Sequence, residues 1–131
     1  MSLTKIKYQT IVIPLGIGVT KAILGVQTDK NYGKLTGVQY ISQDSAAVKG
    51  TTFQKFNIRT VELFPAGHPV TELTTGNISG PEVGPDERYH KMDMKVNQAD
   101  IEITVSDGGN AGGAYTAYVI LRLEDAIDPV N

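Results

Sequence analysis

The stretch YTAYVILRLE, residues 115–124, alternates between two kinds of position along its whole length. Its odd-numbered residues are apolar or small: Tyr115, Ala117, Val119, Leu121 and Leu123. Between them lie Thr116, Tyr118, Ile120, Arg122 and Glu124, a set that includes polar and charged side chains. Successive side chains of a β-strand point to opposite faces, so this period of two predicts a strand whose odd-numbered residues face a core.

A glycine-rich stretch, SDGGNAGG at residues 106–113, precedes this strand and follows another alternating run, Asp100–Ser106. A phosphate-binding loop joins a strand to the N-terminus of a helix, and a P-loop continues into Lys-Ser or Lys-Thr. Here a second strand follows, and the Lys-Ser/Thr pair is missing. We therefore interpret Gly108–Gly113 as a hairpin connection that begins at the turn dipeptide Asp107-Gly108, and not as a phosphate site.

The rest of the chain also reads as short strands separated by turn signals. Six further strands are predicted at Lys5–Ile13, Val19–Gln27, Lys34–Ser42, Thr51–Arg59 with a continuation through Thr60–Phe64, Val70–Thr74 and Glu87–Val96. The continuation assumes a β-bulge, because the apolar residues change parity between Ile58 and Val61. A short helical turn is expected at Ser45–Lys49, and a long surface crossover at Thr75–Glu87.

Eight strands in a chain of 131 residues predict an all-β fold, an eight-stranded antiparallel sandwich of jelly-roll type. An immunoglobulin-like sandwich usually has seven strands, and its Cys and Trp hallmarks are absent from this sequence. A small closed barrel remains an alternative. We expect one domain over residues 1–131, with a short polar C-terminal end from about residue 125.

Composition excludes several classes of function. The net charge is −2, so no general attraction to nucleic acid or to an anionic membrane is expected. The chain has no cysteine, which excludes disulfides, thiolate metal sites and a Cys nucleophile. The apolar run Ile11–Val19 is broken by Pro14, Gly16 and Gly18 and is too short to span a membrane. It also makes a poor secretion signal, so we interpret it as two strands meeting at a turn.

Residues for catalysis or metal binding do not form a recognisable set. The two histidines, His68 and His90, lack the closely spaced partner that a cupin-type metal site needs. A glycosidase pair would have to be drawn from six acidic residues that the sequence does not distinguish: Asp86, Glu87, Asp93, Asp100, Glu102 and Asp107. No G-x-S-x-G motif is present. The sequence therefore predicts no catalytic, cofactor-binding or metal-ligating residue, no cofactor and no enzymatic activity.

Five segments carry a resemblance to a known class of proteins. They are TDKNYGKLTGVQYIS (28–42), GTTFQKFNI (50–58), VELFPAGHPV (61–70), PDERYHKMD (85–93) and AYTAYVILRL (114–123). Together they resemble the small single jelly-roll virion proteins of icosahedral bacteriophages that occupy vertices or minor capsid positions. The resemblance implies a structural protein located in the virion, with copies of itself and other virion proteins as partners.

Two features of the sequence bear on those partners. The N-terminus offers only Lys5 and Lys7 where a genome-binding protein often has a basic arm, so no direct nucleic-acid contact is expected, and membrane contact is not indicated. Tyr118 and Ile120, opposite the core face of the last strand, suggest that both faces of this strand are partly covered. The Thr75–Glu87 connection is the expected contact between copies.

Two alternatives stay open. One is a carbohydrate- or receptor-binding sandwich that uses the Thr75–Glu87 connection and the tyrosines, which are Tyr8, Tyr32, Tyr40, Tyr89, Tyr115 and Tyr118. The other is a metal-dependent enzyme of cupin type, which the missing histidine disfavours.

Overall fold

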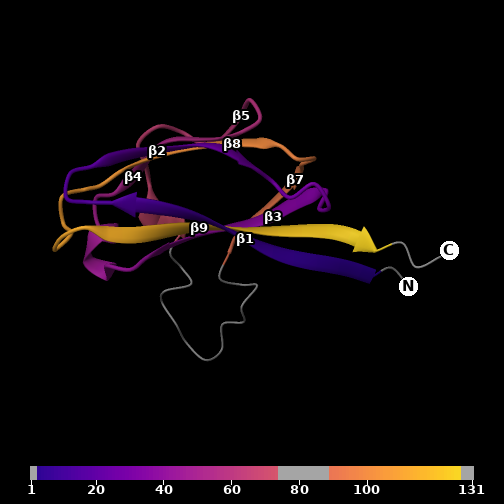
Figure 1. Ribbon diagram of the computed structural model, residues 1–131, viewed down its shortest axis with the longest axis horizontal. Helices are drawn as coiled ribbons and strands as arrows, with labels where there is room; N and C mark the ends of the chain where they lie inside the picture. Colours follow the sequence, from indigo (N-terminus) through magenta and orange to yellow (C-terminus); the bar gives the residue numbers. More distant parts are fainter. Residues whose placement is uncertain (1–2, 74–88, 128–131) are drawn as a thin grey trace.

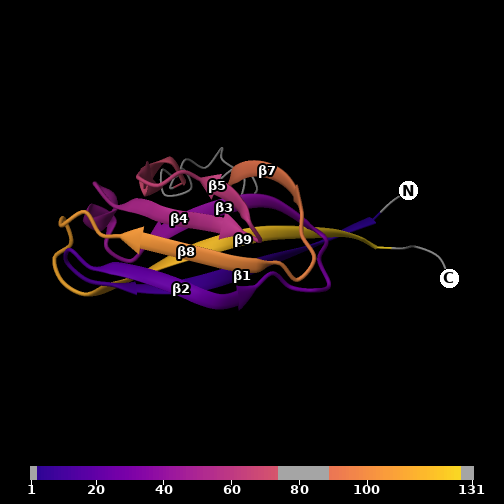
Figure 2. The same ribbon diagram turned by 90° about the horizontal axis from the view of Figure 1, so that it is seen from above.

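The computed structural model describes residues 3–73 and 89–127, which form two antiparallel β-sheets packed face to face (Figures 1 and 2). Sheet A has the strand order β1-β9-β3-β7, and sheet B has the order β2-β8-β4-β5, with β6 also paired to β4. The strands are β1 (Leu3–Leu15), β2 (Thr20–Gln27), β3 (Lys34–Ser42), β4 (Thr52–Ile58), β5 (Val61–Phe64), β6 (His68–Pro69), β7 (His90–Lys95), β8 (Asp100–Ser106) and β9 (Tyr115–Ile127). The prediction of an all-β antiparallel sandwich is confirmed.

The core lies between the two sheets and follows from the alternation in the sequence. On β9 the predicted inward residues Val119, Leu121 and Leu123 are fully buried, and Ile103 and Val105 on β8 face them from sheet B. The residues between them on β9, from Thr116 to Glu124, are half-buried, as expected for a partly covered outer face. An aromatic cluster of Tyr40, Phe53, Phe56 and Phe64 fills the remaining core, with ring centroids 5.1–5.9 Å apart.

Strand pairing is nested along the chain. β1 pairs with β9 from Leu3↔Ile127 to Leu15↔Tyr115, β2 pairs with β8, β3 with β7, and β4 with β5. Consecutive strands β8 and β9 therefore belong to different sheets. The glycine-rich stretch does join two strands, but the prediction of a hairpin there was wrong, because it crosses from one sheet to the other.

The predicted continuation of one strand through a bulge at residues 59–60 was also wrong. The chain reverses there, and β5 pairs antiparallel with β4 through Ile58↔Val61. Arg59 makes the reversal possible with a φ of 58°, a left-handed conformation that is uncommon for a residue with a side chain. Its N–H is held by the carbonyl of Asp100 at 2.7 Å. The change of apolar parity marked a tight turn and not an inserted residue.

Two further elements differ from the sequence prediction, and one short helix is confirmed. The strand expected at Val70–Thr74 is a 3-10 helix, η2 (Val70–Leu73), which buries Val70 and Leu73. The helical turn expected near residue 45 is confirmed as the 3-10 helix η1 (Ser45–Val48). The strand predicted over residues 115–124 is longer than expected, because β9 continues to Ile127. The Thr75–Glu87 connection lies outside the described residues, so its role stays a prediction.

Candidate interaction surface

The glycine-rich connection between β8 and β9 uses its amide groups within the protein. The amide of Gly109 donates to the carboxylate of Asp107 at 2.8 Å, and the amide of Gly112 donates to the carboxylate of Asp44 at 3.0 Å. The Gly108 amide donates to the hydroxyl of Thr51 at 3.1 Å. A phosphate would have to displace these acceptors to reach the loop. The geometry therefore explains the glycines structurally, and a Cβ on Gly108 would come within 2.3 Å of the main chain of Gly50.

Asp107 is the centre of this region, which lies at the end of the sandwich opposite the chain termini (Figure 1). Its carboxylate is buried and accepts hydrogen bonds from the amides of Gly18 and Gly109, both at 2.8 Å, and from the hydroxyl of Tyr115 at 2.5 Å. Burial by itself raises the pKa of Asp107, but these three donors outweigh it and hold the pKa below its ordinary value. The network ties the β1–β2 turn to the start of β9.

The two buried tyrosines of this end stay protonated. Burial raises the pKa of Tyr115, and the hydrogen bond to the Asp107 carboxylate raises it further. Burial also raises the pKa of Tyr40, and the charge of Asp107 adds to the effect. The Tyr40 hydroxyl has no hydrogen-bond partner among the described residues. At neutral pH both tyrosines therefore stay protonated and Asp107 stays ionised. Groups that keep one protonation state suit a structural network better than proton transfer.

The two histidines come together on one aromatic ring and not on a set of carboxylates. His68 stacks on Phe64 with centroids 4.8 Å apart, and His90 meets the same ring edge-on at 5.5 Å. One carboxylate is near, since Glu72 lies 3.6 Å from Nε2 of His68. Within residues 3–73 and 89–127 no three His, Asp or Glu side chains are grouped as metal ligands.

Of the six acidic residues considered for glycoside hydrolysis, Asp86 and Glu87 lie outside the described residues. Asp93 pairs with Lys34 at 3.3 Å, and Glu102 pairs with Lys55 at 2.6 Å. The remaining two also have partners within the protein, since Asp100 accepts from Gln27 at 2.8 Å and Asp107 holds the network above. Each of the four described carboxylates is thus engaged with a different partner within the protein.

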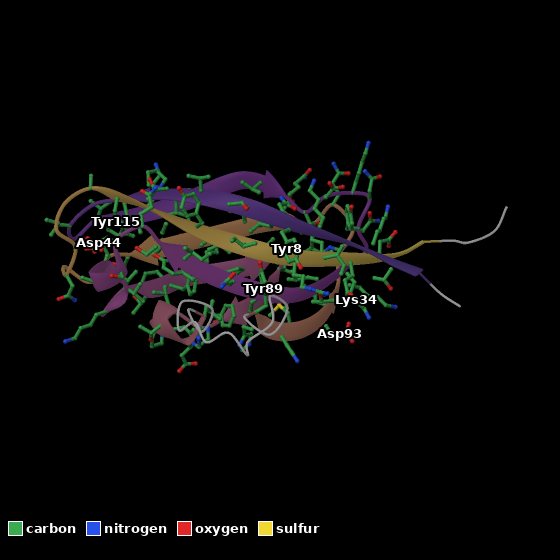
Figure 3. All side chains as sticks on the ribbon, turned by 90° about the horizontal axis from the view of Figure 1, so that it is seen from below. Tyr8, Lys34, Asp44, Tyr89, Asp93 and Tyr115 are labelled. Atoms are coloured by element: carbon green, nitrogen blue, oxygen red, sulfur yellow. The ribbon has the colours of Figure 1, made fainter. Side chains whose placement is uncertain are left out.

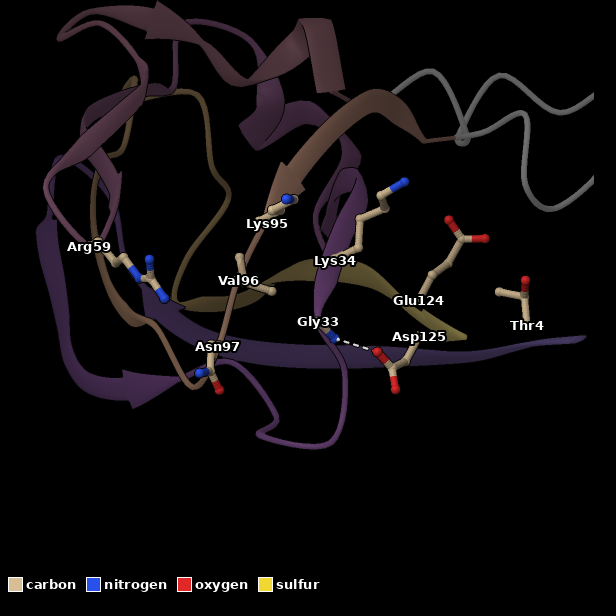
Figure 4. Close-up of a pocket in the computed structure, with 9 residues that line it drawn as sticks. All are labelled: Thr4, Gly33, Lys34, Arg59, Lys95, Val96, Asn97, Glu124 and Asp125. Carbon is tan, nitrogen blue, oxygen red and sulfur yellow. Dashed lines mark hydrogen bonds between the residues drawn. The ribbon is translucent and has the colours of Figure 1, made fainter. Parts of the chain in front are cut away.

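A cavity of about 620 Å³ is lined by residues that include Thr4 of β1, Lys34 of β3, Lys95 of β7 and Glu124 of β9 (Figure 4). Lys34, Arg59 and Lys95 line it together with Glu124 and Asp125, so its charges are mixed in sign. Its carboxylates are engaged, since Glu124 lies 3.3 Å from Arg122 and Asp125 accepts from the Gly33 amide at 3.2 Å. The described lining residues include no His, Cys or Ser that could act as a nucleophile with a base beside it.

The tyrosines proposed for carbohydrate binding do not share one surface. Tyr40 and Tyr115 are buried in the core, and Tyr32 and Tyr118 are half-buried. Tyr8 is exposed on β1, and its ring lies 5.6 Å from that of Tyr89, which Figure 3 shows beside it. Tyr8 and Tyr89 are therefore the two tyrosines that could form part of an aromatic binding surface.

Exposed apolar side chains, in contrast, gather at one side of the sandwich. Seven large hydrophobic residues are exposed in the described part of the chain, and six of them belong to β1, β2 or the turn between them. We call these six the β1–β2 patch: Ile6, Tyr8, Val12, Ile17, Val19 and Leu24. The seventh, Val61, lies on β5. A concentration of this kind is typical of a surface that contacts another molecule.

The sequence analysis missed this patch, although a signal for it was present. The apolar run Ile11–Val19 contains Val12, Ile17 and Val19, and it was interpreted as two strands meeting at a turn without asking which of its side chains are exposed. On β1 the apolar residues occupy both parities, since Ile11 and Ile13 are buried while Val12 between them is exposed. β1 therefore presents apolar side chains on its outer face as well as on its core face.

Neither a protein-family model nor a curated protein nor a solved structure matches this chain. The described residues contain no helix long and apolar enough to cross a lipid bilayer. The function is therefore argued from the geometry above and from the resemblance noted in the sequence.

Proposed function

We propose that this protein is a non-enzymatic structural protein that acts through protein–protein contacts, first of all with copies of itself. The observation that carries the proposal is the β1–β2 patch, with Val12 and Leu24 exposed by 54% and 67%. Interfaces often have an apolar centre, and these six exposed apolar side chains lie on two neighbouring edge strands and on the turn that joins them. The polar networks around Asp107 and Asp44 hold loops in place and leave their donors engaged.

We also propose that the sandwich is a jelly roll. A jelly roll has eight strands in two sheets, arranged as two Greek keys. The nested pairing supports this assignment. Rolling up one long antiparallel hairpin pairs the first strand with the last, the second strand with the second to last, and so on inward, as β1–β9, β2–β8, β3–β7 and β4–β5 do here. If the two-residue β6 is set aside, the described part of the chain has eight strands in this arrangement.

The place of action that we propose is a virus particle, as a capsid, vertex or minor capsid component. The support is the resemblance of residues 28–42, 50–58, 61–70, 85–93 and 114–123 to small bacteriophage jelly-roll proteins, together with the strand order. Other virion proteins would then be its second kind of partner. The net charge of −2 fits a partner that is protein and not nucleic acid.

The mass of the purified full chain in solution tests the proposal. Analytical ultracentrifugation over a wide range of concentrations is expected to show a reversible or stable multiple of the 14.1 kDa chain. Electron microscopy of the same sample would show whether closed particles form. A chain that stays monomeric at the highest concentrations and binds a glycan on an array would support the carbohydrate-binding alternative, with Tyr8 and Tyr89 as its first candidates.

A further inference from the structure

Apart from the two-residue β6, the described part of the sandwich has four edge strands, and three of them are protected against pairing with another chain. β5 is only four residues long. β7 has six residues, of which Lys91, Asp93 and Lys95 are charged. β2 is interrupted by a bulge between Ile23 and Val26. Short length, charge and bulges are the devices by which proteins block edge-to-edge association.

The fourth edge, β1, is long and has no bulge in its register with β9; its charged residues Lys5 and Lys7 lie in its first half, and Pro14 lies near its end. It runs for thirteen residues, and its register with β9 is continuous from Leu3 to Leu15. No other described strand pairs with it. A long, regular edge of this kind is a template for a further strand.

The hydrogen bonds of β9 determine which groups of β1 point outward. The amide of Thr116 donates to the Gln43 side chain and its carbonyl accepts from the Gln43 amide, so the main chain of Thr116 points toward the β3 side. Its partner on β1 is Pro14. Because the main chain of Thr116 points away from β1, Pro14 makes no main-chain hydrogen bond with it, and the carbonyl of Pro14 points away from β9. Because strand parity alternates, the main-chain groups of Ile6, Thr10 and Val12 also point away from β9.

The side chains at this edge suit an uncharged contact. Ile6, Thr10 and Val12 are exposed and carry no charge. The two lysines of β1 are paired within the chain, since Lys7 lies 2.6 Å from Asp29 and Lys5 lies 4.0 Å from Asp125. Two copies of β1 brought together would bury apolar side chains without placing unpaired charges opposite each other.

We propose that β1 pairs antiparallel with β1 of a second copy of this chain, so that the two copies of sheet A become one continuous sheet. This inference rests on the proposed function and names its first contact. A second copy fits because a two-fold axis between two antiparallel edges pairs residue i of one copy with residue j of the other and residue j with residue i, so a single edge is complementary to itself. Pro14 ends the pairing at one side, because it has no N–H, and leaves Thr4–Val12 as the paired segment.

The test measures the dimer dissociation constant of the full chain by analytical ultracentrifugation, with two matched substitutions. Val12→Lys places a charge on the β1 edge, twice per dimer, and should raise the dissociation constant by at least about tenfold. Val61→Lys is the control, because Val61 is exposed to a similar degree, 50% against 54%, on the edge strand β5. The control should leave the constant within about twofold.

A second variant probes the main chain itself. Thr10→Pro removes an outward N–H while leaving the ladder between β1 and β9 intact, so it should weaken the dimer as Val12→Lys does. Circular dichroism of each variant checks that the sandwich is folded. Hydrogen exchange then gives a readout specific to strand pairing, since the amides of Thr10 and Val12 should be protected in the dimer and exchange fast in the Val12→Lys monomer.

The outcomes separate this inference from the proposed function. If the wild-type chain assembles and neither β1 variant weakens it, while Leu24→Lys on β2 does, the contact lies elsewhere in the β1–β2 patch. The edge pairing is then wrong and the structural role stands. Unprotected Thr10 and Val12 amides in the assembled protein would also overturn the edge pairing. A wild-type chain that never associates overturns both.

Discussion

β1 and β9 are neighbouring strands of thirteen residues each, paired residue by residue, yet their outer faces differ. Tyr118 and Ile120 on β9 are half-buried, whereas Val12 on β1, the partner of Tyr118, is mostly exposed. The two strands have similarly apolar sequences, so composition does not explain the contrast. β9 has a strand on each side, and β1 has a described strand on one side only. The comparison shows that the position of a strand in the sheet decides whether its outward apolar side chains are covered by other parts of the same chain.

The largest effect is expected at the centre of β9. Leu121→Ala removes a fully buried side chain and should lower the free energy of unfolding by about 2–5 kcal/mol, the range for a large-to-small change in a packed core. Thr116→Ala, on the outer face of the same strand, should cost far less. Denaturant unfolding of both variants measures the difference, and equal losses would mean that the inner and outer faces of β9 are assigned the wrong way round.

The next effect concerns the link between the beginning of β9 and the end of β1. Asp107→Ala leaves the buried Tyr115 hydroxyl without its acceptor, at a cost of about 1–3 kcal/mol, whereas the amides of Gly18 and Gly109 belong to exposed residues and can bond water instead. Asp44→Ala is the matched control, because Asp44 also accepts two amide bonds but at exposed positions. Thermal unfolding should show the larger loss for Asp107, and a greater loss for Asp44 would contradict the role of the network.

The same network predicts how stability depends on pH. The pKa of Asp107 is lower in the folded chain, because its three hydrogen-bond donors outweigh the effect of burial. Its contribution to stability is therefore complete above the ordinary value of 3.8 and is lost as the pH falls through the folded pKa. Unfolding titrations toward acid should show this loss, and Asp107→Asn should reduce it. If Asp107→Asn loses stability toward low pH as steeply as the wild-type chain does, the effect belongs to other carboxylates.

The buried tyrosines Tyr40 and Tyr115 affect stability at alkaline pH. Burial raises the pKa of Tyr115 and of Tyr40 in the folded chain, so their contribution is present below the ordinary value of 10.0 and is lost as the pH rises toward the folded pKa. Ultraviolet titration of tyrosine ionisation should find two groups that ionise only on unfolding. Tyr115→Phe should remove one of them.

A smaller effect is expected on the edge strand. Val12→Ala, measured at concentrations where the chain is monomeric, should change the free energy of unfolding by no more than about 0.5 kcal/mol, because the side chain is mostly exposed. Val119→Ala on β9 is its counterpart, a fully buried valine opposite Ile11, and should cost more than about 1 kcal/mol. Similar losses at the two positions would mean that the outer side of β1 is covered within one chain.

No effect at all is expected for anions at the loop that leads into β9. Titration with inorganic phosphate or with nucleotides should leave the amide chemical shifts of Gly108–Gly113 unchanged, because Asp107, Asp44 and Thr51 already accept from this loop. Saturable shifts there would require the loop to exchange these acceptors for a ligand, and would reopen the phosphate-site interpretation.

The sequence by itself determined the strands and their faces, because alternation is a property of neighbouring residues. The inward set of β9, the bounds of β3 and β8, and the turn near Ser45 could all be predicted in this way. Glycine-rich composition likewise predicted that residues 108–113 connect two strands. The absence of a motif for catalysis is also a feature of the sequence alone, and the choice of a structural role follows from it as a proposal.

Only the tertiary structure decided which strands are neighbours. The supposed hairpin at Gly108–Gly113 crosses between sheets, the supposed bulge at Arg59 is a reversal, and the supposed strand at Val70 is a 3-10 helix. The exposed edge of β1 is of the same kind, since nothing within Leu3–Leu15 says that β9 will pair with one side and no described strand with the other. The physical reason is that side-chain alternation is set locally, whereas strand partners are chosen by hydrogen bonds and burial between segments that can lie far apart in the chain, as Leu3 and Ile127 do.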